Sequence, residues 1–304
     1  MELVGRIAPF FALIAAGAVL ARLGVLGERP GRWISGYTYW IGFPALLVSW
    51  LGSAPPPDAS LARALIAYAF AMAAVLAIAV VLGRARPWPN EARAGVPLVS
   101  AVGNTAFLGA PLATSVLGES ARAPAAAVVA VDFILLLGLG VAVLQGGRGD
   151  GLARGLRRVL LNPTVVGAGI GLAISGFRLR LPGPAAEGLE LLAATASPVA
   201  LVALGGLIGR ERIWPARREL EPLGAALALK IVLAPFAVWA ALGLAGSPPD
   251  LTAVAVLLAA CPTAVNVFIQ TRAAGVWARP AAQAVAIGTV ISALTLTLAA
   301  HLLT

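Results

Sequence analysis

The chain has 304 residues, of which 60% are hydrophobic and only 12% are charged, and its formal net charge is +9. Soluble domains carry roughly 25% charged residues, so this composition excludes an ordinary soluble enzyme and predicts an integral membrane protein. A single cysteine and a single histidine exclude a disulfide framework and argue against a Cys/His metal site, while the only lysine, Lys230, is followed by Ile231, which excludes a nucleotide-binding P-loop.

Apolar stretches of about 20 residues recur along the chain, separated by segments rich in glycine, proline and charge. They predict an all-α polytopic membrane protein with ten transmembrane helices. The expected spans are 4–22, 34–52, 61–83, 94–117, 123–145, 159–177, 188–209, 220–245, 251–273 and 280–303. No connection is long enough for a separate soluble domain, and the first span lacks the basic leader and cleavage site of a signal peptide.

The arginines are distributed unevenly between the two sides of these spans. Sixteen of them fall in the loops after the odd-numbered spans and five fall on the opposite side. The positive-inside rule therefore places the first set in the cytoplasm and both chain termini outside. The same distribution explains the net charge without nucleic acid, since no basic run is interleaved with aromatics. Six tryptophans near span ends are expected to be interface anchors: Trp33, Trp40, Trp50, Trp88, Trp214 and Trp277.

Three sequence markers recur at nearly one offset. Pro44 and Pro198 lie 154 residues apart, the Thr-Ala pairs that begin at Thr105 and Thr263 lie 158 apart, and a further proline pair opens spans 123–145 and 280–303. These offsets predict two copies of a five-helix unit, residues 1–147 and 148–304. Because five is odd, the second copy enters the membrane from the other face, which gives the inverted repeat common in secondary transporters.

The spans 94–117 and 251–273 are expected to be broken. Pro111 clashes with the carbonyl four residues back, at Phe107, and Pro262 does the same to Leu258. A freed backbone group in hydrocarbon costs several kcal/mol unless another group bonds it. The nearby polar groups able to do so are Asn104, Thr105, Thr263, Asn266 and Gln270. Each break also creates a half-helix N-terminus with partial positive charge, so two facing breaks near the midplane predict an anion site. The alternative is an ordinary packing kink in each helix.

Asp132 and Lys230 are the two ionisable residues well inside the expected spans. A charge near the bilayer centre costs at least about 2.5–3.5 kcal/mol on insertion scales, so such residues normally face a cavity or a partner. One interpretation is functional, with Asp132 as a proton or cation site and Lys230 as a counter-charge for substrate. The other is a structural salt bridge between the two.

At the two interrupted segments the chain resembles the auxin efflux carrier family, the bacterial relatives of plant PIN carriers, which belongs to the bile acid/arsenite/auxin transporter superfold. The motifs that carry the resemblance are "GNTAFLGAPLATSVLGE" and "ACPTAVNVFIQTRAAG". Supporting matches are "IGFPALLVSWL", "RRVLLNPTVVGAGIGL" and "LALKIVLAPF", and the likeness covers essentially the whole chain in order.

The resemblance implies two inverted five-helix repeats with the broken helices crossing near the midplane. It implies a scaffold of spans 4–22, 34–52, 159–177 and 188–209 that supports a mobile unit formed by the other six spans, in an elevator-like movement. By position, Asn104 and Pro111 match one crossover and Pro262 and Asn266 the other. Substrates of the family are organic anions, namely auxin in plants and carboxylates such as malate or malonate in bacteria. The central loop "GGRGDGLARGLRR" is short, unlike that of the plant carriers.

The sequence thus predicts a secondary transporter, not an enzyme, that moves a small organic anion across a bacterial inner membrane. No cofactor is expected; H⁺ or Na⁺ is the open choice of coupling ion, and a homodimer through the scaffold spans is a possible assembly. Two alternatives remain: a sodium-coupled symporter of the bile acid type, and a non-transporting membrane scaffold or receptor. The substrate-site candidates are Asn104, Thr105, Pro111, Pro262, Thr263, Asn266 and Gln270, with Asp132 and Lys230 as coupling or charge candidates.

Overall fold

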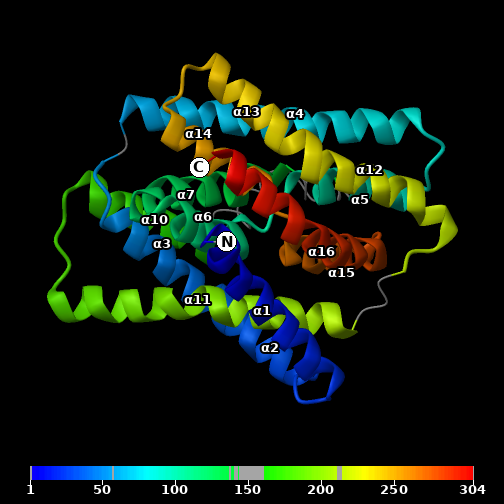
Figure 1. Cartoon of the computed structure of the whole chain (residues 1–304), viewed down its shortest axis with the longest axis horizontal. Helices are drawn as coiled ribbons and strands as arrows, with labels where there is room; N and C mark the ends of the chain where they lie inside the picture. The colour runs from blue at the N-terminus through cyan, green and yellow to red at the C-terminus, as the bar shows by residue number, and fades with distance from the viewer. Residues whose placement is uncertain are drawn as a thin grey trace.

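A computed structural model of the chain describes residues 2–56, 58–136, 138, 139, 143, 161–210 and 214–303. Regular structure in these residues is helical, apart from an isolated bridge between Gly103 and Thr263 (Figure 1). The all-α prediction is therefore confirmed for the described part of the chain.

The α-helices of the first half are α1 (Glu2–Arg22), α2 (Glu28–Tyr37), α3 (Phe43–Gly52), α4 (Ala59–Ala85), α5 (Asn90–Ala101), α6 (Ala110–Leu117) and α7 (Arg122–Val131). Those of the second half are α10 (Pro163–Gly176), α11 (Gly183–Arg210), α12 (Leu220–Ala228), α13 (Ala234–Leu244), α14 (Pro249–Ala259), α15 (Val265–Ala274) and α16 (Ala278–Leu303). Four π-helical turns extend or join them: η1 (Thr38–Gly42), η2 (Thr105–Gly109), η4 (Asp132–Leu136) and η6 (Leu229–Leu233).

Five described helical segments are long and apolar enough to cross a membrane: Val4–Arg22, Ala59–Ala85, Gly183–Arg210, Arg217–Leu244 and Ala278–Leu303. They coincide with five of the expected spans. Of the other expected spans, 94–117 and 251–273 are interrupted by a break, 34–52 contains the π-helical turn η1, and 123–145 and 159–177 run into residues that the structure does not describe. The described helices therefore indicate a multi-pass membrane protein. The count of ten spans stays a prediction.

Some sequence predictions lie outside the described residues. They are the end of span 123–145, the loop "GGRGDGLARGLRR", the repeat boundary between residues 147 and 148, and the loop arginines Arg148, Arg154, Arg157, Arg158 and Arg212.

Several helix ends follow directly from local sequence. Asp58 caps α4 by accepting a hydrogen bond from the Leu61 amide at 2.8 Å, and Asn162 caps α10 in the same way through the Thr164 amide at 2.9 Å. The hydrogen bond from Leu61 lowers the pKa of the exposed Asp58 carboxyl, because it favours the charged form. At the other end of a helix, Gly275 ends α15 in the left-handed conformation that glycine adopts without strain.

Two helix pairs are packed so closely that only glycine fits between them. A side chain at Gly205 of α11 would overlap the Ile14 carbonyl of α1, and one at Gly17 would overlap the Val202 carbonyl. The second pair is α3 and α10, where a methyl group at Gly167 would lie 2.7 Å from Pro44 Cα. We call these two contacts the glycine seams. Such close backbone approach is typical of helix pairs in membranes, where packing rather than hydrophobicity drives association.

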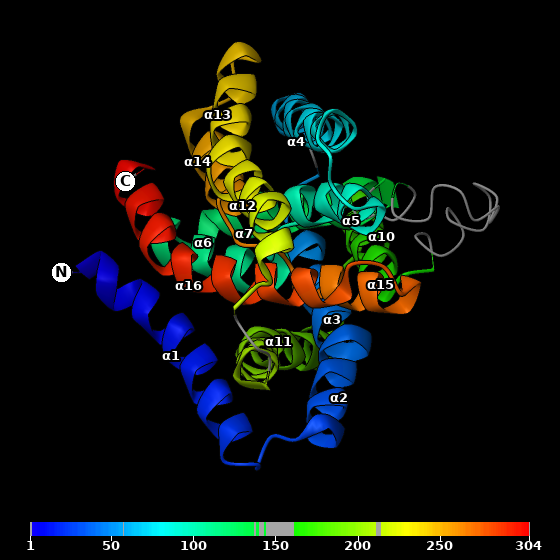
Figure 2. The same ribbon diagram turned by 90° about the vertical axis from the view of Figure 1, so that its right-hand side faces the viewer.

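The glycine seams define one group of helices, which contains α1, α2, α3, α10 and α11. In Figure 2, α1, α2, α3 and α11 lie together on the lower side, while α4, α12, α13 and α14 lie on the upper side. Helices α5, α6, α7, α15 and α16 pass between these two sides, and their side chains form much of the buried core. The interrupted segments thus lie at the centre of the molecule.

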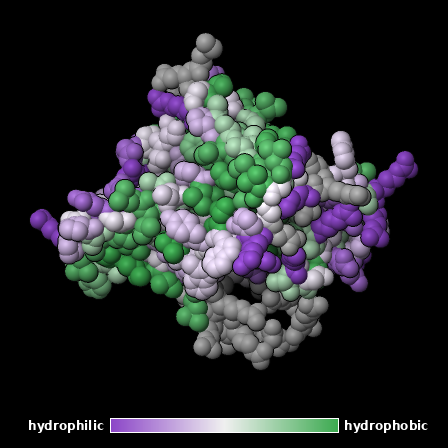
Figure 3. Space-filling model, turned by 90° about the horizontal axis from the view of Figure 1, so that it is seen from below, coloured by the Kyte–Doolittle hydropathy of each residue, from purple (hydrophilic) through white to green (hydrophobic). Residues whose placement is uncertain are grey.

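Large apolar side chains are exposed on the outer helices, among them Phe70, Trp239, Leu244 and Leu294. Figure 3 shows hydrophobic surface over the centre and the lower left of one face, with strongly hydrophilic side chains along the left edge and at the right-hand end. Exposed apolar area on this scale fits a surface covered by lipid.

The tryptophan prediction is wrong for two positions. Trp33, Trp40 and Trp214 are exposed, as interface anchors would be, but Trp88 and Trp277 are buried. The Trp277 indole donates a hydrogen bond to Glu219 Oε2 at 2.7 Å and covers Gly95 of α5. Trp277 therefore joins the turn between α15 and α16 to the start of α12, a contact that its position near a span end does not reveal.

Candidate functional site

The two segments that were expected to be broken are both interrupted, and the interruptions touch. Helix α5 ends at Ala101 and helical structure resumes at Thr105, while α14 ends at Ala259 and α15 begins at Val265. The backbone amide of Asn104 donates to the Pro262 carbonyl at 2.7 Å, and the backbone amide of Ala264 donates to the Val102 carbonyl at 3.1 Å. These bonds form the antiparallel bridge, which we call the crossover. It satisfies backbone groups that would otherwise be unpaired in the interior.

The predicted role of Pro111 in breaking the first segment is wrong. Pro111 lies in the first turn of α6, and the interruption comes at residues 102–104. The helical segment that starts at Thr105 continues through η2 into α6, so Pro111, which has no N–H, leaves the Phe107 carbonyl without its usual helical donor. The consequence predicted for Phe107 does hold, since its carbonyl accepts a hydrogen bond from Ser197 Oγ of α11 at 2.7 Å. Pro262, in contrast, lies within the second interruption.

Asn104 is the most unusual polar residue of the crossover. Its side chain is 1% exposed, and within the described residues neither its amide nitrogen nor its side-chain oxygen has a hydrogen-bond partner. Its backbone carbonyl accepts from the Leu108 and Gly109 amides at 3.1 and 3.0 Å, which fixes the residue at the start of η2. A buried, unpaired polar group costs about 1–3 kcal/mol, so such a group in a native site needs an explanation.

Thr105 and Thr263 occupy matching places in the two halves but differ in bonding. The Thr263 hydroxyl donates to the Val99 carbonyl at 3.0 Å and so closes the end of α5. The buried Thr105 hydroxyl has no hydrogen bond of good geometry in the described residues, although it lies beside the Asp132 carboxyl group. Thr263 therefore bonds the backbone, whereas the Thr105 hydroxyl faces the Asp132 carboxyl group.

Asn266 lies in the first turn of α15, directly after the crossover, and Gln270 lies about one turn farther along. Both are partly exposed, and the described residues show no hydrogen bond from either side chain to the crossover. The structure therefore places Asn104, Thr105, Pro262 and Thr263 together, Asn266 beside them, and Gln270 and Pro111 farther along their helices.

Two helical segments begin at the crossover and two end there. The first turns of η2 and of α15 start at Thr105 and Val265, while α5 and α14 terminate at Ala101 and Ala259. The amides of a first turn have no helical acceptor and carry partial positive charge, whereas the last carbonyls carry partial negative charge. The crossover thus offers both an anion-attracting and a cation-attracting side.

Lys230 is completely buried on η6, and its ammonium nitrogen donates to the Ala259 carbonyl at 2.8 Å. Asp132 is 1% exposed on η4, and its Oδ1 accepts from the Tyr68 hydroxyl at 2.7 Å. Among the described residues no ion pair joins the two, and Asp132 Oδ2 has no hydrogen-bond partner. The simple salt bridge is therefore not the arrangement found: each charge bonds a different neutral group.

π-Helical turns carry Thr105, Asp132 and Lys230. Such turns are rare and are frequently found at functional sites, because the extra residue changes which way a side chain points. The sequence does not predict these π-helical turns. It also gave no reason to propose Tyr68 or Ser197 as site residues. A tyrosine in the middle of the apolar span 61–83 is a signal that could have identified Tyr68.

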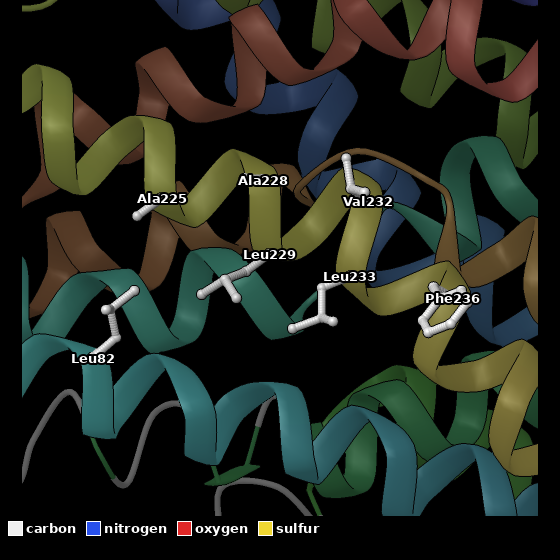
Figure 4. A pocket seen from close by; sticks show the side chains of 7 residues that line it. All are labelled: Leu82, Ala225, Ala228, Leu229, Val232, Leu233 and Phe236. Atoms are coloured by element: carbon white, nitrogen blue, oxygen red, sulfur yellow. The ribbon is translucent and has the colours of Figure 1, made fainter.

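The clearest surface grooves lie away from the crossover. One groove of about 390 Å³ is lined only by apolar side chains of α4, α12, η6 and α13, among them Leu82, Val232 and Phe236 (Figure 4). The second lies farther along α4 and α13 and includes Arg63. The first groove offers no polar side chain to orient a charged ligand, and the second offers Arg63 alone.

Apolar outer helices around a buried, interrupted pair define a membrane transport protein rather than an enzyme. The family model described as "Membrane transport protein" matches residues 3–155 and 152–300 of the chain. The chain therefore belongs to this family, which confirms the resemblance to the auxin efflux carriers. It is also 28% identical over 307 residues to a Rhizobium meliloti (strain 1021) protein named "Putative malonate transporter", with 97% of this chain and 94% of the relative covered.

Proposed function

We propose that the protein is a secondary transporter of a small organic anion, with a short carboxylate such as malonate as the first substrate to test. The observation that carries this proposal is the buried side-chain amide of Asn104, which has no hydrogen-bond partner among the described residues and lies where two half-helices begin. The name of the Rhizobium meliloti relative supports the same class of substrate.

A carboxylate at the crossover would accept hydrogen bonds from the side-chain amide of Asn104, the Thr105 hydroxyl and the first-turn backbone amides of α15. Hydrogen bonds to a charged acceptor are roughly twice as strong as neutral ones, and the partial charge of the helix N-terminus adds to them. Asn266, partly exposed on α15, is the next side chain that such a ligand would meet. The groups that lack partners in the present conformation are thus the ones that the ligand would satisfy.

The proposed architecture is ten spans in two inverted repeats, residues 1–147 and 148–304, in a bacterial inner membrane with both termini outside. Three observations support it: the crossover pairs the two halves in antiparallel fashion, the α3–α10 and α1–α11 seams each join one half to the other, and the two matched family segments overlap only at residues 152–155. The arginine distribution supports the orientation.

An elevator movement is the proposed route of alternating access. The helices of the glycine seams would form the scaffold, and α4–α7 with α12–α16 would carry the crossover. Contacts between the two groups include the ring contact of Phe43 with Phe107 at 4.3 Å, the Ser197 hydrogen bond to Phe107 and the ion pair between Arg122 and Glu190 at 3.2 Å, and the movement would exchange these contacts for others. The exposed Trp33 and Trp40 on the scaffold side support a homodimer through the scaffold helices.

Malonate counterflow in proteoliposomes tests the function. The purified protein should exchange external radiolabelled malonate for internal unlabelled malonate, and Asn104→Ala should lower the binding affinity roughly 5–30-fold, which corresponds to about 1–2 kcal/mol. Asn90→Ala, on the exposed start of α5, is the matched control and should behave as the wild type. Counterflow that no dicarboxylate supports, or unchanged affinity in Asn104→Ala, would contradict the proposal.

A further inference from the structure

The Lys230 ammonium occupies an exceptional position. It is fully buried, it lies 2.8 Å from the carbonyl of the last residue of α14, and a methyl group at Gly103 would come within 2.9 Å of it. Lys230 therefore contacts the end of α14 directly and fills the space beside the residue that follows the end of α5. No side chain larger than hydrogen fits at Gly103 without moving the ammonium.

The electrostatics of the crossover explain why a cation belongs there. Helices α5 and α14 both end at the crossover, and their last carbonyls carry partial negative charge in a region with little water. The Asp132 carboxyl group adds to this negative potential, since it lies close enough to interact with Lys230 although it bonds Tyr68. A positive charge at this point stabilises both helix ends and leaves the N-termini on the other side of the crossover free for an anion.

We propose that Lys230 is a built-in cation of the crossover, which supplies through a side chain the charge that a bound metal cation would otherwise supply. Substrate binding then requires neither Na⁺ nor any other dissociable cation. Lys230 acts as a positioning residue, since it holds the two helix ends and does not touch the anion. The part that concerns the anion rests on the proposed function; the part that concerns the helix ends does not.

The wild-type protein provides the first test. Malonate affinity should be the same within about twofold in sodium chloride and in choline chloride at equal ionic strength. Affinity that rises more than about fivefold in sodium would overturn the proposal. A protein that binds no dicarboxylate in either salt would count against the proposed function instead, and the stability measurements below would then decide on Lys230.

Removal of the ammonium provides the second test. Lys230→Ala should lower the melting temperature of the ligand-free protein and reduce malonate affinity at least tenfold. Methylammonium, which fits the vacated space, should restore both in part and should leave the wild type unchanged. Lys230→Met fills that space with an apolar chain and should not respond. Val232→Ala, two residues along η6 and exposed in the apolar groove, is the matched control.

A folded Lys230→Ala protein that binds malonate as the wild type does, or that ignores methylammonium in both measurements, would refute the built-in cation. If the Lys230 variants do not fold, Gly103→Ala replaces them, because it displaces the ammonium without removing it. This variant should lose malonate affinity and melting temperature together, and an unchanged protein would refute the proposal.

Discussion

The glycine seams and the crossover are both contacts between the two halves of the chain, but they are built on opposite principles. At the seams, backbone meets backbone across Gly17, Gly205 and Gly167, with no side chain between. At the crossover, Asn104, Thr105 and Asp132 retain buried polar atoms without hydrogen-bond partners in the described structure. The seams are backbone contacts that need no ligand, whereas under the proposed function the polar atoms of the crossover would bond the substrate. Stability should therefore depend on the first region and binding on the second.

The largest effect is expected from filling a seam. Gly167→Leu would force a side chain into the Pro44 backbone, and overpacking of a tight contact costs roughly 1–3 kcal/mol or more. We expect a melting temperature lowered by several degrees and loss of the monodisperse peak in size-exclusion chromatography. Gly169→Leu is the control on the same helix, since nothing lies within 4 Å of that position. Equal behaviour of the two variants would mean that the seam is not a stabilising contact.

The next effect separates binding from stability at the crossover. Asn104→Leu replaces an unpaired buried amide by an apolar side chain of similar size, which is neutral or stabilising for the fold. We expect an unchanged or raised melting temperature together with loss of malonate binding by isothermal titration calorimetry. A variant that is destabilised and still binds would reverse the assignment of roles to the two regions.

Thr263→Val should have a smaller and opposite effect. The change removes the hydrogen bond to the Val99 carbonyl, which contributes about 0.5–1.5 kcal/mol, while it preserves the shape of the side chain. We expect a melting temperature a few degrees lower and malonate affinity within threefold of the wild type. Tenfold weaker binding would place Thr263 in the ligand site beside Thr105.

The smallest effect concerns the exposed cap of α4, which belongs to neither region. The pKa of Asp58 is lowered by its hydrogen bond from the Leu61 amide, so its contribution to stability is present above the ordinary carboxyl pKa and is lost as the pH falls through the lowered value. Asp58→Ala should therefore lower the melting temperature slightly at pH 7 and by less at pH 3. A larger difference at pH 3 would be inconsistent with a charged cap, and Asp58→Asn, which can still cap the helix, is the control.

Local sequence determined much of this protein. The composition predicted a helical membrane protein. The glycines and prolines of residues 100–118 and 261–270 predicted interruptions, and the polar side chains beside them are the groups that can bond the backbone atoms freed in a membrane interior. The matched spacing of Thr105 and Thr263 indicated that the two interruptions correspond. The position of the first interruption was not foreseen: it comes at residues 102–104, before Pro111, and Pro111 lies inside the helical segment that runs from Thr105 to Leu117.

Only the tertiary structure decided which of these residues keep free polar groups. Thr105 and Thr263 are equivalent in sequence, yet one hydroxyl is bonded to Val99 and the other is not, since the acceptor lies 164 residues away in the chain. Likewise, the residues next to Lys230 in the sequence do not predict its hydrogen bond to Ala259, and those next to Asp132 do not predict its hydrogen bond from Tyr68. Hydrogen bonds between distant segments depend on how whole helices pack, and packing sets distances that no single stretch of sequence contains.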